Sequence, residues 1–177
     1  MPSDHRVVAV TGAAGFIGRN LVVRLREQGH EVRPLVRGST AQDIEAALTG
    51  AGVVFHLAGA VRPRDPGEFA QSVAFTDALT AQVARAGQRP LVIYSSSRKA
   101  AEQTPFGDAT RACETALLRL GGRGEATVAV YRLPNVFGKW ARPDYNSGVA
   151  TFCHNLARGL PIRIDDPDAP LCLLYVD

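Results

Sequence analysis

Three glycines near the start of the chain have the spacing of a dinucleotide-binding turn: Gly12, Gly15 and Gly18. In such a turn the first glycine lets the chain leave a strand tightly. The second lets the backbone approach a pyrophosphate, and the third allows helix and sheet to pack closely. The pyrophosphate lies at a helix N-terminus, where N–H groups and the helix dipole favour anions. The chemistry indicated is dinucleotide binding, and the alternative is a glycine-rich loop without a ligand.

The elements on either side of these glycines are the ones that such a turn requires. The apolar run Val7–Val10 predicts a strand, and the apolar spacing over Ile17–Gln28 predicts a helix that Gly29 ends. Strands alternate with helices along the rest of the chain, which predicts a Rossmann-type, doubly wound parallel α/β sheet with helices on both faces. A length of 177 residues fits one domain, 1–177.

The second predicted strand, Glu31–Val36, contains Pro34, which favours a sheet edge because proline cannot donate to a strand ladder. Only 16 residues, 37–52, separate it from the next apolar run. A strand, a helix and two loops need roughly twice that length. We therefore expect the usual third strand to be missing, with the second strand at the sheet edge.

Arg37 follows the second strand, where NAD-binding Rossmann domains place an acidic residue for the ribose 2′-hydroxyl. An arginine there accommodates the 2′-phosphate of NADP, so Arg37 favours NADP(H) over NAD(H). The alternative is a surface arginine. The other expected elements are a helical pattern within 39–52, strands over 53–58, 91–94, 126–131 and 162–164, and helices over 68–86, 107–120 and 147–158.

Composition excludes several classes of function. The net charge is only +3, and the 18 arginines among 20 basic residues are scattered, so nucleic acid is not an expected partner. No apolar run approaches 18 residues, and residues 1–6 lack the apolar region of a signal peptide. Three cysteines without CxxC spacing are expected to be reduced thiols used in packing, which predicts a cytoplasmic protein without a metal site.

Four segments together resemble the extended short-chain dehydrogenase/reductases of the NAD-dependent epimerase/dehydratase family. They are TGAAGFIG (11–18), VVFHLAG (53–59), YSSS (94–97) and YRLPNVFGKW (131–140). The last third of the chain is similar to the reductase half of bifunctional reductase–cupin enzymes of capsular polysaccharide synthesis. Those enzymes act on UDP-2-acetamido-2,6-dideoxy-hexos-4-uloses on the route to UDP-N-acetyl-L-fucosamine. The resemblance implies the same fold and a nucleotide-sugar substrate.

The resemblance also implies two sets of binding residues. The cofactor set lies in the glycine turn, after the second predicted strand, at the end of the third and after residue 133, and comprises Gly12, Ala14, Gly15, Phe16, Ile17, Gly18, Arg37, Leu57, Ala58, Gly59, Pro134, Asn135 and Val136. The substrate set lies in 139–177, which resembles the start of the substrate-binding part, and comprises Lys139, Trp140, Arg142 and Asn146.

At the catalytic positions the chain departs from the family pattern. Members use a Tyr-x-x-x-Lys pair after the serine strand; here Phe106 stands at the Tyr position and Thr110 at the Lys position. Ser97 still matches the catalytic Ser, whereas Ser72 stands where many members have an Asn that relays protons. A phenol beside an ammonium is a suitable general acid for ketone reduction, and such an acid contributes about 10²- to 10⁴-fold in rate. The standard mechanism is therefore expected to be impaired.

Three residues could substitute for the missing acid: Lys99, Tyr145 and His154, each of which also has an ordinary surface or packing interpretation. Several hypotheses remain. The first is an NADP(H)-dependent reductase or epimerase of nucleotide sugars, and a variant of it is a relative with non-redox chemistry. The second is a catalytically inactive module that binds a cofactor or a partner, and the third is a scaffold. Relatives continue past the segment at 175–177, so we expect an incomplete substrate lobe, open on one side or completed by a partner chain. The resemblance also implies that the helices over 68–86 and 107–120 pair in a homodimer; their apolar content equally suits packing on the sheet.

Overall fold

The computed structural model describes residues 6–62, 65 and 67–177. The amino-terminal stretch 1–5, on which part of the signal-peptide argument depends, lies outside the described residues. The helices and strands are, in chain order, β1 (Val7–Thr11), α1 (Phe16–Glu27), β2 (Glu31–Leu35), α2 (Ala41–Leu48), β3 (Val53–His56), α3 (Gly67–Ala86), β4 (Leu91–Ser97), the 3₁₀ helix η1 (Arg98–Ala101), α4 (Pro105–Gly122), β5 (Thr127–Leu133), β6 (Asn135–Phe137), α5 (Gly148–Leu156) and β7 (Leu173–Tyr175).

Five strands form one parallel sheet in the order β2-β1-β3-β4-β5. The predicted α/β class and the missing third strand are confirmed, because α2 leads from β2 directly to β3. β2 is an edge strand, as Pro34 indicated, and Pro34 lies opposite Val10 of β1 in the ladder. The chain crosses from one side of β1 to the other after β2. The carboxyl ends of β1 and β3 therefore lie side by side, where this class of sheet binds its ligands.

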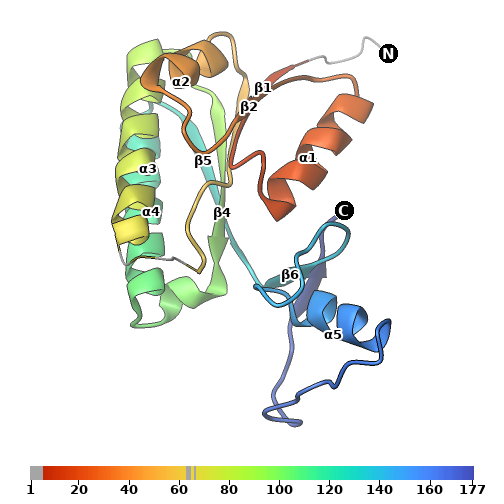
Figure 1. Ribbon diagram of the computed structural model, residues 1–177. Helices are drawn as coiled ribbons and strands as arrows, with labels where there is room; N and C mark the ends of the chain where they lie inside the picture. Colours follow the sequence, from red (N-terminus) through yellow and green to blue (C-terminus); the bar gives the residue numbers. More distant parts are fainter. Residues whose placement is uncertain (1–5, 63–64, 66) are drawn as a thin grey trace.

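Helices cover both faces of the sheet, but unequally (Figure 1). α1 lies on one face, and α2, α3 and α4 form a layer on the other. The alternation of side chains along β1 explains both layers, since Val8 and Val10 join the apolar cluster with α1 whereas Ala9 joins the cluster with the other helices. The second cluster is the larger one and includes Leu79 of α3 and Leu117 of α4.

The carboxyl-terminal part forms a separate small layer beyond the sheet. β6 and β7 pair in parallel, with Val136 opposite Leu174, and α5 lies beside them. The strand expected over 162–164 was wrong, because that segment has no regular structure. The alternation of isoleucine and arginine over 162–164 favours a strand but does not specify a strand for it to pair with. In this part, all of whose residues are described, β6 pairs instead with β7, almost forty residues later in the chain.

The other element predictions hold to within a few residues at each end. α4 begins two residues earlier than expected because Thr104 caps it, with its hydroxyl accepting from the Gly107 N–H at 3.1 Å, and Pro105 fits the first helical position. β5 extends two residues further than expected, to Leu133. Within the described residues no helix combines the length and the apolar character needed to cross a membrane.

Candidate functional site

The glycine turn connects β1 to α1, and its shape depends on glycine at two positions. Gly12 has φ of +67°, and a Cβ there would lie 2.8 Å from the backbone of Leu57 and Ala58. A Cβ on Gly18 would lie 2.2 Å from the carbonyl oxygen of Gly12. The third glycine was expected to bring the helix close to the sheet. Its tightest contact is instead with the turn itself.

The N-terminus of α1 has the features of an anion site. Gly15 caps it in an extended conformation, no side chain caps the helix, and its first turn contains no acidic residue. Added carbon atoms at Gly12 and Gly18 would collide with backbone, whereas one at the exposed Gly15 would meet only the Gly12 oxygen, at 3.1 Å. Backbone therefore packs closely around Gly12 and Gly18, whereas the turn is open to solvent at Gly15. A pyrophosphate fits at the open side because the dipole and the first N–H groups of α1 are directed toward it.

A buried histidine joins the two strands beneath this turn. The Thr11 hydroxyl lies 2.8 Å from Nδ1 of His56 and accepts from the N–H groups of Leu57 and Ala58, both at 3.1 Å. A hydroxyl has one proton, so with both lone pairs engaged Thr11 donates to Nδ1. Nε2 therefore carries the ring proton and donates to Thr76 of α3 at 2.9 Å. Burial lowers the pKa of His56 to about 4, so the ring is neutral near pH 7.

Arg37 lies just beyond β2, with 84% of its side chain exposed. Its guanidinium is 3.4 Å from a carboxylate oxygen of Glu68, at the start of α3. Two charges of opposite sign thus stand together on the side of the sheet where β1 and β3 end. The segment after β3 is held by Ser72, whose hydroxyl accepts from the Ala60 N–H at 3.0 Å and donates to the Glu68 carbonyl. Ser72, expected at a proton-relay position, thus has a backbone-binding role.

The three positions expected to carry catalysis lie at the end of β4 and the start of α4. The Ser97 hydroxyl accepts from the Lys99 N–H at 3.2 Å and caps η1. The Phe106 ring lies 6.1 Å, centroid to centroid, from that of Phe69 on α3. Thr110 is buried, and its hydroxyl donates to the Phe106 carbonyl at 2.7 Å. Thr110 thus makes a bond within its own helix, and the Phe106 ring lies beside that of Phe69.

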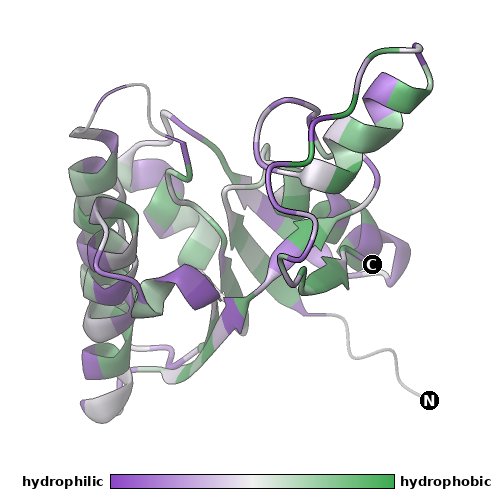
Figure 2. Ribbon diagram, turned by 90° about the horizontal axis from the view of Figure 1, so that it is seen from below, coloured by the Kyte–Doolittle hydropathy of each residue, from purple (hydrophilic) through white to green (hydrophobic). Residues whose placement is uncertain are grey.

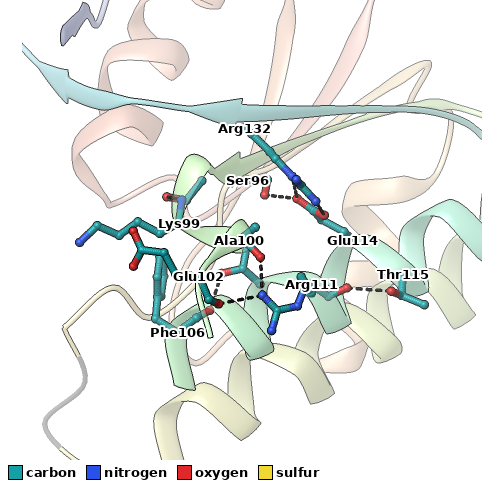
Figure 3. A network of polar contacts seen from close by, with 11 residues as sticks. Ser96, Lys99, Ala100, Glu102, Phe106, Arg111, Glu114, Thr115 and Arg132 are labelled. Atoms are coloured by element: carbon teal, nitrogen blue, oxygen red, sulfur yellow. Dashed lines mark hydrogen bonds and ion pairs between the residues drawn. The ribbon is translucent and has the colours of Figure 1, made fainter. Parts of the chain in front are cut away.

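A polar network that the sequence analysis missed lies between α4 and the strands β4 and β5 (Figure 3). Ser96 donates to the Glu114 carboxylate, and Arg132 of β5 binds the same carboxylate through Nε at 2.9 Å and Nη2 at 2.7 Å. Only 8% of the Glu114 side chain is exposed. The hydrogen bonds from Arg132 lower the pKa of Glu114, so the carboxylate is charged. The spacing of Glu114 four residues after Thr110 was the available signal, because both then lie on one helix face.

The three possible substitutes for the catalytic acid lie in η1, in the loop after β6 and in α5, whereas Phe106 lies at the start of α4. Lys99 is exposed and extends away from the Glu114–Arg132 pair (Figure 3). Tyr145 is exposed with the Arg142 guanidinium 5.6 Å from its ring centroid, and His154 lies in the last turn of α5. The structure therefore places these residues on three different elements.

The segment from Pro134 to Asn146 runs from the end of β5 through β6 into the following loop. Asn135 and Val136 are in β6, and the Lys139 ammonium lies 3.3 Å from Asp177. The Trp140 ring has two cations nearby, Arg19 at 5.1 Å and Lys139 at 5.5 Å. The loop thus presents half-exposed aromatic rings with basic side chains beside them, a combination that suits a phosphorylated ligand with a planar base.

The cysteines differ from one another in burial. Cys113 is buried, near Thr76, and burial raises the pKa of its thiol. Cys153 and Cys172 are exposed, so the packing role expected for all three holds only for Cys113. Among the residues that the structure describes, no group of three or more His, Cys, Asp or Glu side chains is arranged to hold a metal ion.

Comparison with known protein families decides the relationship. The family model described as "NAD dependent epimerase/dehydratase family" matches residues 8–166, which contain the glycine turn, the serine strand and the segment after β5. The chain belongs to the NAD-dependent epimerase/dehydratase family. Members of this family bind NAD(P), which agrees with the shape of the glycine turn.

Individual relatives place the chain near nucleotide-sugar enzymes of this family. It is 44% identical over 172 residues to UDP-2-acetamido-2,6-beta-L-arabino-hexul-4-ose reductase of Pseudomonas aeruginosa, covering 96% of this chain and 46% of the relative. The crystal structure of the capsular polysaccharide assembling protein CapF from Staphylococcus aureus superposes with a TM-score of 0.79 at 34% identity, covering 96% of this chain and 45% of that one. The chain thus spans about half the length of these relatives.

A more distant solved structure shares the fold. The UDP-N-acetylglucosamine 4-epimerase from Bacillus cereus superposes with a TM-score of 0.80 at 18% identity, covering 96% of this chain and 67% of that one. At this identity the likeness supports the architecture of the epimerase/dehydratase family alone. The Rossmann-type sheet described above is thus the family fold.

Proposed function

We propose that this chain is an NADP(H)-binding domain related to nucleotide-sugar 4-ketoreductases and epimerases, in which the standard catalytic acid is absent. The observation that supports this proposal is the contrast between the glycine turn, which suits a dinucleotide, and the start of α4, where the catalytic acid is expected. The glycine turn retains the geometry for a pyrophosphate. The start of α4 presents Phe106 beside Phe69, with Thr110 bound to its own helix.

The chemistry follows from this contrast. Bound NADPH supplies a hydride, and the protein must supply a proton to the oxygen of the reduced ketone. Phe106 has no proton to donate. Thr110 has no charge with which to lower the pKa of a neighbour, and its hydroxyl proton is engaged with the Phe106 carbonyl. Ser97 remains available to orient a ketone through its hydroxyl. Dinucleotide binding without efficient reduction is the behaviour that these residues support.

Thermal melting tests dinucleotide binding. A ligand that binds only the folded state stabilises it, by about 2.7 kcal/mol at one hundred times its Kd. We expect NADP⁺ to raise the melting temperature more than NAD⁺ does. A melting temperature that neither dinucleotide changes would leave the scaffold hypothesis standing.

Restoring the acid tests the catalytic half of the proposal. We expect the unmodified chain to oxidise NADPH negligibly with a UDP-linked 4-keto-6-deoxy sugar. We expect Phe106→Tyr combined with Thr110→Lys to increase the rate by about 10²-fold or more. Phe69→Tyr is the matched control, since it adds the same hydroxyl to the neighbouring ring. Efficient turnover by the unmodified chain would refute the proposal, whereas inactivity of the restored, folded variant would favour a binding module whose substrate lobe is incomplete.

The preference for NADP(H) is proposed from Arg37. Its exposed guanidinium makes one long contact with Glu68, at 3.4 Å, and can turn toward a 2′-phosphate. We expect Arg37→Ala to weaken NADP⁺ binding about tenfold, because a charge-assisted bond to phosphate is lost, and to leave NAD⁺ binding unchanged. Arg26→Ala, at the far end of α1, is the control. Equal losses for both dinucleotides would contradict this assignment.

We also propose that further polypeptide covers the carboxyl-terminal part. No residue of α5 is buried, and every residue of β7 is exposed. Figure 2 shows this part projecting away from the layer of α3 and α4. A two-stranded sheet is marginal by itself. This cover is either more of the same chain or a partner chain. Separately, we propose that two copies of the chain pair across α3 and α4 in a cytoplasmic homodimer. Sedimentation measurements on the full natural protein test the dimer.

A further inference from the structure

Asn20 joins the glycine-turn helix to a loop 119 residues further along the chain. It lies in the second turn of α1, is 3% exposed, and donates through Nδ2 to the Lys139 carbonyl at 3.0 Å and to the Phe16 carbonyl at 2.9 Å. Both partners are acceptors, so the orientation of the amide is determined. Its Oδ1 is buried and has no hydrogen-bond partner among the residues that the structure describes. Leaving a buried oxygen without a hydrogen-bond partner destabilises the folded state.

The loop that Asn20 holds is itself strained. Trp140 has φ of +67°, a left-handed conformation that bulky residues rarely adopt. Such a conformation persists only where the surroundings enforce it. The enforcing contacts come from neighbouring residues of α1: Asn20 binds the Lys139 carbonyl, and the Arg19 guanidinium lies over the Trp140 ring.

A pocket of about 280 Å³ lies at this junction. Its lining residues are Asn20, Val23, Arg24, Glu27, Lys139 and Asp177. The charged residues are paired with each other, Arg24 with Glu27 at 3.6 Å and Lys139 with Asp177 at 3.3 Å. These pairs neutralise one another, so the pocket has no excess charge with which to attract an ion. The junction is therefore better explained by what it holds in place than by a ligand in the pocket.

We infer that Asn20 is a positioning residue that ties the loop over 138–146 to the turn of α1 next to the dinucleotide site. This inference rests on the proposed function, since the loop carries Lys139, Trp140, Arg142 and Asn146, and α1 is proposed to hold the pyrophosphate. Asn20 lies one turn after the N-terminus of α1, so a movement of that turn on dinucleotide binding is passed to the loop through one hydrogen bond. The unsatisfied Oδ1 of Asn20 and the strained backbone of Trp140 both lower the stability of the folded state, so we attribute them to the function of this connection.

Trp140 is the single tryptophan of the chain, so its fluorescence reports on the loop alone. We expect saturating NADP⁺, whose oxidised ring does not absorb tryptophan emission, to change the Trp140 signal of the unmodified chain. Asn20→Ser keeps a donor for the Phe16 carbonyl, as serine commonly bonds four residues back, but is too short to reach Lys139. We expect this variant to bind NADP⁺ with a Kd within about threefold of the original and to lose most of the fluorescence change.

Hydrogen exchange tests the tie without any ligand. Amides over 139–141 should exchange at least about tenfold faster in Asn20→Ser, because the loop opens locally without its anchor. Asn155→Ala is the matched control, since its Nδ2 also donates to a backbone carbonyl, that of Pro161, but within the carboxyl-terminal part. Circular dichroism establishes that each variant folds, and Asn20→Ala provides a second variant.

Two results would overturn the inference: unchanged exchange over 139–141 in folded Asn20 variants, or a Trp140 response to NADP⁺ equal to that of the unmodified chain. Failure of the proposed function has a different outcome. In that case NADP⁺ changes neither the melting temperature nor the fluorescence of the unmodified chain, while the ligand-free exchange still decides whether Asn20 holds the loop.

Discussion

The Thr11 hydroxyl lies 2.8 Å from Nδ1 of His56 and connects the end of β1 to the end of β3. The same hydroxyl accepts from the N–H groups of Leu57 and Ala58, and the peptide group between these two residues is the backbone nearest to a Cβ added at Gly12. The glycine turn and the segment after β3 are thus held at one spacing by one threonine and one histidine. The proposed dinucleotide site depends on this spacing.

Acid should destabilise the fold through His56. Its pKa is lowered from 6.5 to about 4 in the folded state by burial, so between these values the unfolded chain takes up a proton that the folded chain does not. The free energy of unfolding therefore falls as pH decreases from about 6.5 to about 4, by about 3 kcal/mol in total, and this contribution is fully present above pH 6.5. Urea unfolding at several pH values measures it.

The His56→Gln variant identifies the source of that pH dependence. It should be less stable at pH 7 but should lose most of the slope between pH 6.5 and 4. His154→Gln, in α5, is the control and should retain the slope. A slope that survives unchanged in His56→Gln would show that other groups cause the acid sensitivity.

Removing the Thr11 hydroxyl should cost more than removing that of another buried threonine. Thr11→Val leaves Nδ1 of His56 and two backbone N–H groups without their partner, so we expect a loss of about 3 kcal/mol and weaker NADP⁺ binding. Thr80→Val is the comparison, because the Thr80 hydroxyl makes one local bond, to the Asp77 carbonyl at 2.8 Å, and should cost about 1 kcal/mol. Equal losses in urea unfolding would argue against the network.

Gly18→Ala should disrupt the turn. Its Cβ would lie 2.2 Å from the Gly12 oxygen, which is backbone and cannot move aside without distorting the turn. Overpacking of this kind typically costs about 1–3 kcal/mol, and dinucleotide binding should be lost with it. Gly122→Ala, at the end of α4, has no atom within 4 Å of its new Cβ and should be neutral or slightly stabilising. Melting temperatures with and without NADP⁺ compare the two; undiminished binding by Gly18→Ala would contradict this account.

Arg132→Ala should reveal the buried carboxylate of Glu114. Without the guanidinium, Glu114 keeps only Ser96 among these partners, and its pKa should rise. We expect a destabilisation at pH 7 that is smaller than for a fully buried pair, because half of the Arg132 side chain is exposed. The loss should shrink as pH falls and Glu114 becomes protonated. Arg123→Ala, which removes an exposed pair with Glu125, should cost less stability than Arg132→Ala. Similar costs for both would show that burial of Glu114 contributes little.

Local patterns in the sequence determined the glycine turn, the alternation of strands and helices, and the edge position of β2. Each depends on a few neighbouring residues: glycines where a Cβ would collide, apolar periodicity, and Pro34 in a short strand. The proposed replacement of the catalytic pair by Phe106 and Thr110 also comes from sequence, because their four-residue spacing lies within one helix. These features are encoded by residues close together in the chain, so they can be inferred before the chain is folded.

Only the tertiary structure decided which distant residues meet. Thr11 and His56 are 45 residues apart, and Asn20 and Lys139 are 119 apart. Ser96 and Arg132 converge on Glu114 from two strands. β6 and β7 pair, whereas 162–164 forms no strand. Hydrogen bonds of this kind have no sequence period, because their geometry depends on how the sheet and helices bring separate segments together. The sequence therefore predicted where a dinucleotide would bind, and the fold decided what holds that site in shape.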